Sequence, residues 1–259
     1  MESGQAGGAV VHRKQRPETV AENVLCAGVR EDGIMTEYAI IIAGGRIDDD
    51  FALRFVQRAI ARKERPLLIA ADKGLVFLDR HGIVPDVIVG DFDSVPEGYE
   101  DQYLSVHPQV EVHKYRWEKD YTDTEIAARR AVEKGCKVID FLGATGTRFD
   151  HMLGCVQLLA LLLDRGVVGR ILDPYNRITM HQQSFRIMRK EQWGKYVSLF
   201  AWGGELGGVT LTGFHFPMEN GRITTAETLT VSNEIGEESA EVRFESGMLL
   251  MVESKDRPG

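Results

Sequence analysis

The sequence has little cysteine. Only three of its 259 residues are cysteines, Cys26, Cys136 and Cys155, and no two of them form a C-x-x-C pair. A disulfide framework uses paired cysteines and a zinc knuckle needs closely spaced ligands, so the sequence indicates neither. We therefore expect reduced cysteines and a cytoplasmic location.

Long hydrophobic runs are also missing. No segment approaches the roughly 20 apolar residues that a membrane-spanning helix requires. The first residues lack the basic and then apolar layout of a secretory signal. We expect a soluble protein without a membrane partner.

Positively charged residues are in deficit: the sequence has 31 Lys and Arg residues and 39 Asp and Glu residues, which gives a formal net charge of −8. Proteins that bind nucleic acids generally neutralise phosphates with a surplus of cations, so this balance argues against a nucleic-acid partner. A phosphorylated small ligand would have to be met locally, by a metal ion and a few chosen cations.

The N-terminal segment, residues 1–36, is rich in Gly, Glu, Arg and Lys and has little periodicity. We predict that it is a disordered extension. The first apolar run that is typical of a strand begins at Tyr38, just after Met35, so we expect Met35 to be the functional start.

Two domains are predicted from the change in pattern along the chain. In residues 37–165, short apolar runs alternate with amphipathic stretches, which is typical of a mostly parallel, Rossmann-like α/β sheet covered on both faces. In residues 166–259, short alternating runs separated by Gly, Asn and Pro favour an antiparallel β-sandwich. We place the boundary near residue 165 and expect the two domains to pack closely.

Three acidic clusters lie where apolar runs of the first domain end, and ligands bind at such strand ends in open α/β sheets. In the first cluster, Asp91 and Asp93 flank Phe92. If the strand geometry continues, both carboxylates face the same way and can share a hard cation such as Mg²⁺. The alternative for an isolated D-x-D is an Asx-turn with solvated acids.

The second cluster covers residues 119–125. Thr122 and Glu125 have the T-x-x-E spacing of a helix capping box, and we assign both residues to that role. Asp120 and Asp123 remain available for a metal ion or for the helix dipole. Lys119 is either a phosphate contact or a solvated charge.

The third cluster, residues 143–151, reads G-x-x-G-x-R-x-D-H. A glycine-rich loop before a helix offers backbone N–H groups to an anion, and the guanidinium of Arg148 suits phosphate oxygens. Asp150 alone would be read as a helix cap. His151 is equally compatible with a buried, hydrogen-bonded histidine and with a ligand contact.

Together, the three clusters and their order resemble the thiamine pyrophosphokinase family. The resemblance runs from about Tyr38 to Glu253 and includes the Ala71-Asp72 pair, the Ser232-Asn233 pair and Gly213. It implies an N-terminal α/β domain that binds ATP, a C-terminal β-sandwich, and a homodimer with thiamine held between subunits. It also implies transfer of a pyrophosphoryl group from ATP to the hydroxyl of thiamine, giving thiamine diphosphate and AMP with Mg²⁺ as cofactor.

The resemblance also assigns roles to residues. The expected metal ligands are Asp91, Asp93 and Asp123, and the expected catalytic residues are these three together with Asp72, Arg148 and Asp150. The expected contacts to ATP are Asp72, Lys73, Ser94, Lys119, Asp120, Gly143, Gly146 and Arg148. The expected contacts to thiamine are Asp150, Ser232, Asn233 and Trp202; the tryptophan is also compatible with a core position.

Two positions depart from the family pattern. Lys73 stands where glycine commonly follows the Ala-Asp pair, and it would add a cation near the phosphates. Cys155 stands where asparagine is usual, so the hydrogen bonds of that amide are in doubt. Two other functions remain open: a related metal-dependent phosphotransferase or nucleotidyl hydrolase, and a non-catalytic sensor of thiamine or nucleotide.

Overall fold

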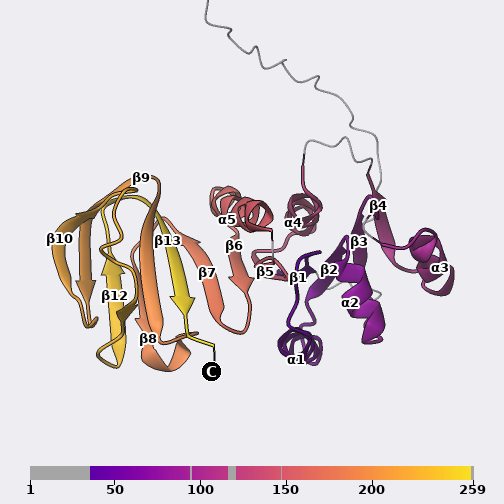
Figure 1. Ribbon diagram of the computed structural model, residues 1–259, viewed down its shortest axis with the longest axis horizontal. Coiled ribbons are helices and arrows are strands. Elements are labelled where there is room, and N and C mark those ends of the chain that lie inside the picture. Colours follow the sequence, from indigo (N-terminus) through magenta and orange to yellow (C-terminus); the bar gives the residue numbers. More distant parts are fainter. Residues whose placement is uncertain (1–35, 94, 116–120, 147, 258–259) are drawn as a thin grey trace, which may run out of the picture.

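The computed structural model describes residues 36–93, 95–115, 121–146 and 148–257. Strands and helices alternate in its first half, and strands dominate the second (Figure 1). The helices are α1 (Asp49–Ile60), α2 (Gly74–Arg80), α3 (Tyr99–Val106), α4 (Asp123–Glu133) and α5 (Phe149–Leu163). The strands of the first half are β1 (Tyr38–Ile42), β2 (Leu67–Ala71), β3 (Val87–Gly90), β4 (Glu111–Lys114), β5 (Val138–Leu142) and β6 (Val168–Leu172). Those of the second half are β7 (Asn176–His181), β8 (Phe185–Met188), β9 (Tyr196–Thr212), β10 (Met218–Ile223), β11 (Asn233–Glu234), β12 (Ser239–Arg243) and β13 (Ser246–Ser254).

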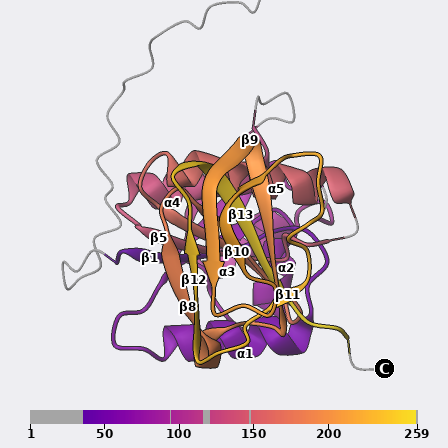
Figure 2. The same ribbon diagram turned by 90° about the vertical axis from the view of Figure 1, so that its left-hand side faces the viewer.

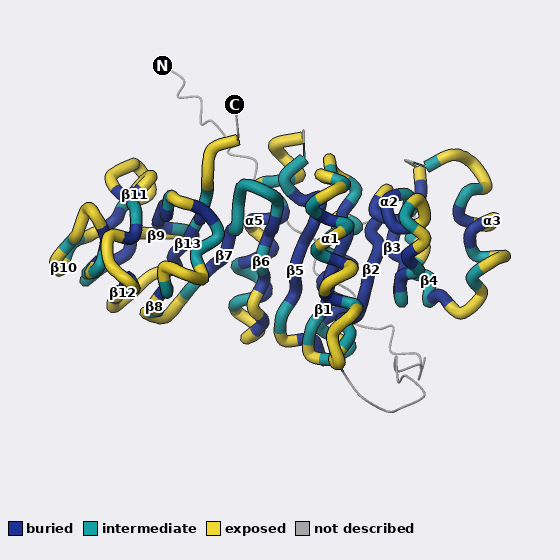
Figure 3. The backbone as a smooth tube through the Cα atoms, turned by 90° about the horizontal axis from the view of Figure 1, so that it is seen from below, coloured by how far each residue is buried: buried dark blue, intermediate teal, exposed yellow. Residues whose placement is uncertain are grey.

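The first six strands form a parallel sheet in the order β4-β3-β2-β1-β5-β6. Its central strands are buried on both faces, as their continuous apolar sequences require (Figure 3). Ile40, Ile41 and Ile42 of β1 are fully buried. The strand order reverses direction between β1 and β5. Such a switch point opens a crevice at the carboxyl ends of the strands.

Helices cover both faces of the parallel sheet. Figure 2 shows α4 and α5 above the sheet and α1 below it. The residues of α1, α2 and α3 share one core cluster with the sheet, and those of α4 and α5 share another. The predicted α/β architecture is confirmed.

The second half is the predicted antiparallel sandwich, and β9 belongs to both of its sheets. The first part of β9 pairs with β13, in the sheet that continues through β7 and β6 into the parallel strands. The second part pairs with β10 and β12 in the other sheet. Gly203 and Gly208 have φ of 70° and 65°, so glycine allows the strand to turn between the sheets.

A buried polar network ties three neighbouring strands of the parallel sheet together. The carboxylate of Asp140 is fully buried and accepts hydrogen bonds from Arg170 Nε and Nη2, at 2.5 and 2.9 Å, and from the Tyr38 hydroxyl at 2.7 Å. Burial, with a further contribution from Asp140, raises the pKa of Tyr38. The network joins β1, β5 and β6.

The domain boundary near residue 165 stays a prediction. β6 extends the parallel sheet beyond this point, and the antiparallel pairing starts with β7. The predicted N-terminal extension lies outside the described residues, apart from Thr36. None of the helices in the described ranges is long and apolar enough to cross a membrane.

Candidate active site

Three carboxylates meet at the carboxyl edge of the parallel sheet. Asp72 follows β2, and Asp91 and Asp93 follow the neighbouring strand β3. One oxygen of each acid lies within 4.8 Å of the other two. Asp72 and Asp91 are half-buried and Asp93 is exposed, so the group is open to a ligand from solvent. Carboxylate oxygens gathered in this way are suited to a hard divalent cation.

The extended strand geometry that was expected to turn Asp91 and Asp93 to the same side is not present, so this part of the prediction was wrong. β3 ends at Gly90 and the strand does not continue through the D-x-D segment. Phe92 instead has φ of 59°, in the left-handed region, and the Asp93 N–H donates to Asp91 Oδ1 at 3.3 Å. An Asx-type turn and a cluster of acids therefore coexist here, although the sequence presented them as alternatives.

Asp123 is the first residue of α4, and it does not belong to the group of three acids whose oxygens lie within 4.8 Å among the described residues. The Thr122 side chain caps this helix by accepting from the Glu125 N–H at 3.2 Å, as predicted. The capping role predicted for the Glu125 side chain is wrong, because its carboxylate accepts from Arg129 on the next turn.

The two glycines of the third cluster have a packing role. A Cβ on Gly143 would lie 2.7 Å from the Ala43 carbonyl oxygen, and a Cβ on Gly146 would lie 2.8 Å from the Arg46 nitrogen; a Cβ on Gly45 would in turn lie 2.3 Å from the Gly143 carbonyl oxygen. The loop after β1 and the loop after β5 thus meet backbone to backbone at the switch point. Close packing is a sufficient reason for these glycines, beside the predicted contact with phosphate.

Arg148 and Asp150 form an exposed ion pair at the start of α5, with Arg148 Nη2 2.5 Å from Asp150 Oδ2. The hydrogen bond from Arg148 lowers the pKa of the Asp150 carboxyl to about 2. Asp150 Oδ1 also accepts from the His151 N–H at 3.0 Å. His151 is exposed, which excludes the buried-histidine reading.

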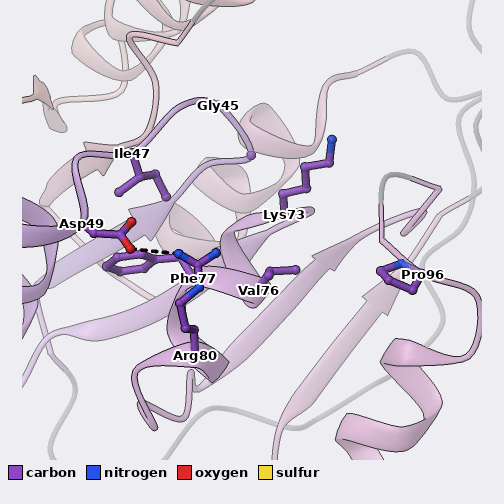
Figure 4. A pocket seen from close by; sticks show the side chains of 9 residues that line it. Gly45, Ile47, Asp49, Lys73, Val76, Phe77, Arg80 and Pro96 are labelled. Carbon is purple, nitrogen blue, oxygen red and sulfur yellow. Dashed lines mark hydrogen bonds and ion pairs between the residues drawn. The ribbon is translucent and has the colours of Figure 1, made fainter.

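A cavity of about 430 Å³ opens between the loop after β1 and α2 (Figure 4). Gly44 in its lining adjoins the acid cluster, because a Cβ there would lie 3.1 Å from Asp72 Oδ2. Lys73, next to Asp72 in the chain, reaches over its rim, and Asp49 is hydrogen-bonded to Arg80 Nη1 at 2.8 Å on its other side. The remaining lining residues are mostly apolar or small: Gly44, Gly45, Ile47, Val76, Phe77 and Pro96. Apart from Lys73, sequence reasoning missed these residues; the Gly-Gly pair just after β1 was the signal that could have found them.

The residues predicted to bind thiamine differ in exposure. Asn233 is buried and its amide is bonded to the Phe216 backbone, at 3.0 Å to N and 2.8 Å to O. Ser232 is exposed, has φ of 57°, and donates its N–H to Ser198 Oγ at 2.9 Å. Trp202 is half-buried and packs against the core cluster shared with α5, so its role as a thiamine contact stays a prediction.

Three of the predicted contacts to ATP, Ser94, Lys119 and Asp120, lie outside the described residues. Cys136 and Cys155 are free and buried, and Cys26 lies outside the described residues. Burial raises the pKa of the Cys155 thiol to about 11, so this position carries a neutral side chain.

Comparison with known proteins places both halves of the chain in the same group. The family model described as "Thiamin pyrophosphokinase, catalytic domain" matches residues 60–167, and that described as "Thiamin pyrophosphokinase, vitamin B1 binding domain" matches residues 182–249. The curated thiamine pyrophosphokinase of Bacillus subtilis is 36% identical over 193 residues, which cover 74% of this chain and 89% of that protein.

Solved structures agree with this assignment. The thiamine pyrophosphokinase of Bacillus subtilis superposes with a TM-score of 0.75 and 33% identity, covering 85% of this chain and 100% of the other. The thiamin pyrophosphokinase of Geobacillus thermodenitrificans superposes with a TM-score of 0.72 and 34% identity, covering 85% of this chain and 98% of the other. The yeast enzyme, at 16% identity with coverage of 88% for both chains, shares the fold with a TM-score of 0.68.

Proposed function

The chain belongs to the thiamine pyrophosphokinase family, and we propose that it transfers the pyrophosphoryl group of ATP to the hydroxyl of thiamine, giving thiamine diphosphate and AMP. The observation that carries this proposal is the group formed by Asp72, Asp91 and Asp93, which adjoins a cavity in a chain that matches both domains of the family. The predicted resemblance is confirmed at the level of the family.

The acid group fits Mg²⁺, because its donors are carboxylate oxygens that approach one another within 4.8 Å. We assign Asp72, Asp91 and Asp93 as the residues that would hold it; Asp123, at the start of α4, would act from the neighbouring helix end. A bound Mg²⁺ would neutralise negative charge on the ATP phosphates.

The cavity suits the nucleoside part of ATP. Ile47, Val76 and Phe77 offer apolar contacts to a planar base, and Asp49 and Arg80 offer polar groups at one side. Lys73 extends from the same rim and carries a charge that would bind a phosphate. In this arrangement the phosphates would run from the cavity towards the acid group.

Pyrophosphoryl transfer requires attack of the thiamine hydroxyl on the β-phosphorus of ATP, and the chain's contribution is mainly position and charge. Arg148 would bind phosphate oxygens through its planar fork, and this would release Asp150 from the ion pair. Asp150 would then contact thiamine near its reacting end. Ser232 would contact the vitamin directly, while Asn233 holds the loop that carries Phe216.

A homodimer would complete the thiamine site. Exposed apolar side chains lie on the first two turns of α5, at Phe149 and Leu153, and on sandwich loops at Phe216, Leu229 and Val231. Phe149 stands between Arg148 and Asp150, and large apolar side chains exposed beside a site are typical of a surface that a second subunit covers. A dimer built through these residues would bring the sandwich of one subunit to the site of the other. A cytoplasmic location stays a prediction.

Replacing Leu229 by Asp is expected to raise the dissociation constant of the dimer by about tenfold or more. Leu229 is exposed in the single chain, and the dimer would bury a charge in its place. Sedimentation velocity over a range of concentrations measures this effect. The control is Val106→Asp on α3, because Val106 is 69% exposed and Leu229 is 71% exposed. Equal association of the unaltered protein and both variants would contradict this surface.

Phosphorus NMR of the protein with ATP, Mg²⁺ and thiamine tests the reaction. We expect thiamine diphosphate and AMP to appear together. ADP with thiamine monophosphate would instead indicate transfer of the γ-phosphoryl group by a different kinase. ATP consumption without any thiamine product would indicate another acceptor, and binding of thiamine without turnover would indicate a sensor.

A further inference from the structure

Phe92 has a backbone conformation that its residue type disfavours. Among the described residues, four that are not glycine have positive φ, and two of them, Asp72 and Phe92, belong to the acidic edge. Asn and Asp tolerate the left-handed region because their short polar side chains bond locally. Phenylalanine has no such compensation, so other contacts must hold Phe92 at φ of 59°.

The compensation comes from the core. The Phe92 side chain is 7% exposed and belongs to the apolar cluster between the sheet and α1, α2 and α3. Its ring lies beside Gly90, where an added Cβ would be 3.5 Å from Phe92 Cε1. The Phe92 carbonyl accepts the Val95 N–H at 3.3 Å, which closes the turn after the acids.

This anchoring fixes the two acids on either side. Asp91 is half-buried, Phe92 is buried and Asp93 is exposed, so the chain dips into the core between the two carboxylates. The Asp93 N–H bonds to Asp91 Oδ1, and both carboxylates reach within 4.8 Å of Asp72. If the ring were not anchored, the segment would be able to relax towards an extended form, which separates these oxygens.

We propose that Phe92 is a positioning residue for the divalent cation: its buried ring holds a strained turn that sets the spacing between the carboxylates of Asp91 and Asp93. The residue does not touch the metal ion or the substrates. The inference rests on the proposed metal site, and it adds that the affinity of this site depends on an apolar ring that points away from it.

The test measures Mn²⁺ binding to the full-length protein by electron paramagnetic resonance, with Mn²⁺ as a probe for Mg²⁺ and no turnover. Phe92→Ala removes the anchor and keeps a non-glycine backbone strained at positive φ, so the segment can relax, and we expect it to raise the Mn²⁺ dissociation constant by about tenfold or more. Phe92→Leu keeps an apolar anchor and should retain most of the affinity. If the alanine variant does not fold, Phe92→Ser, which also lacks the anchor, replaces it.

The matched control is Tyr103→Leu, because Tyr103 is 6% exposed in the same core cluster but lies on α3. It should lower the melting temperature and leave Mn²⁺ affinity unchanged. Unchanged affinity in Phe92→Ala, or an equal loss in Tyr103→Leu, would overturn the positioning role. Failure of the unaltered protein to bind Mn²⁺ would instead overturn the metal site on which both proposals rest.

Discussion

Replacing Asp93 by Asn is expected to lower the rate of thiamine diphosphate formation by about 10³-fold. The substitution keeps the shape of the side chain but removes one negative oxygen from a group whose members lie within 4.8 Å of one another. Because amide oxygens bind Mg²⁺ more weakly than carboxylates, charge on the ATP phosphates would be poorly neutralised. The initial rate of AMP release at saturating ATP measures this decrease.

The fold should survive this change. Asp93 is exposed, and in metal-free buffer its carboxylate is close to those of Asp72 and Asp91. Like charges at short range repel, so the Asp93→Asn variant should melt at the same temperature as the unaltered protein or slightly above it. Asp101→Asn, an exposed acid on α3, serves as the control and should keep full activity. A wild-type rate in Asp93→Asn would refute the metal assignment.

Replacing Arg170 by Met is expected to destabilise the protein by about 3–5 kcal/mol. The change leaves the fully buried carboxylate of Asp140 with the Tyr38 hydroxyl as its remaining partner in the network. An uncompensated charge in the middle of a parallel sheet costs more than the methionine side chain recovers by packing. Urea unfolding followed by circular dichroism measures the difference in the free energy of unfolding.

The control for this prediction is a surface arginine. Arg186 lies 4.0 Å from Glu241 and its side chain is 64% exposed, so Arg186→Met should change stability by less than about 1 kcal/mol. Equal effects of the two substitutions would mean that the Asp140 network does not stabilise the sheet.

Much of the fold could be predicted because buried segments have characteristic apolar patterns in the sequence. The continuous apolar run of β1 predicted a strand covered on both faces, and Thr122 predicted the start of a helix. The path of β9 could not be predicted in this way. Its pairing with two sheets depends on partners far away in the chain, and single glycines gave no indication of which sheet each part would join.

The candidate site shows the same limit. Residue types identified the acids, but the contact between Gly45 and Gly143 and the left-handed turn at Phe92 are properties of the folded chain. Periodicity alone placed Asp91 and Asp93 on one side for the wrong reason. The cavity was missed because its walls come from the loop after β1, from α2 and from Pro96, which are distant in sequence.

The unbroken sheet has a mechanical consequence. β6 pairs with β5 on one side and with β7 on the other, so the backbone ladder runs from the parallel strands into the sandwich. A hinge at this junction would have to break the pairing of Arg170, Ile171 and Leu172 with β7. The chain should therefore behave as one rigid body. Movements that admit substrates and release products would then occur in the loops at its carboxyl edge or, in the proposed dimer, through a shift of one subunit against the other.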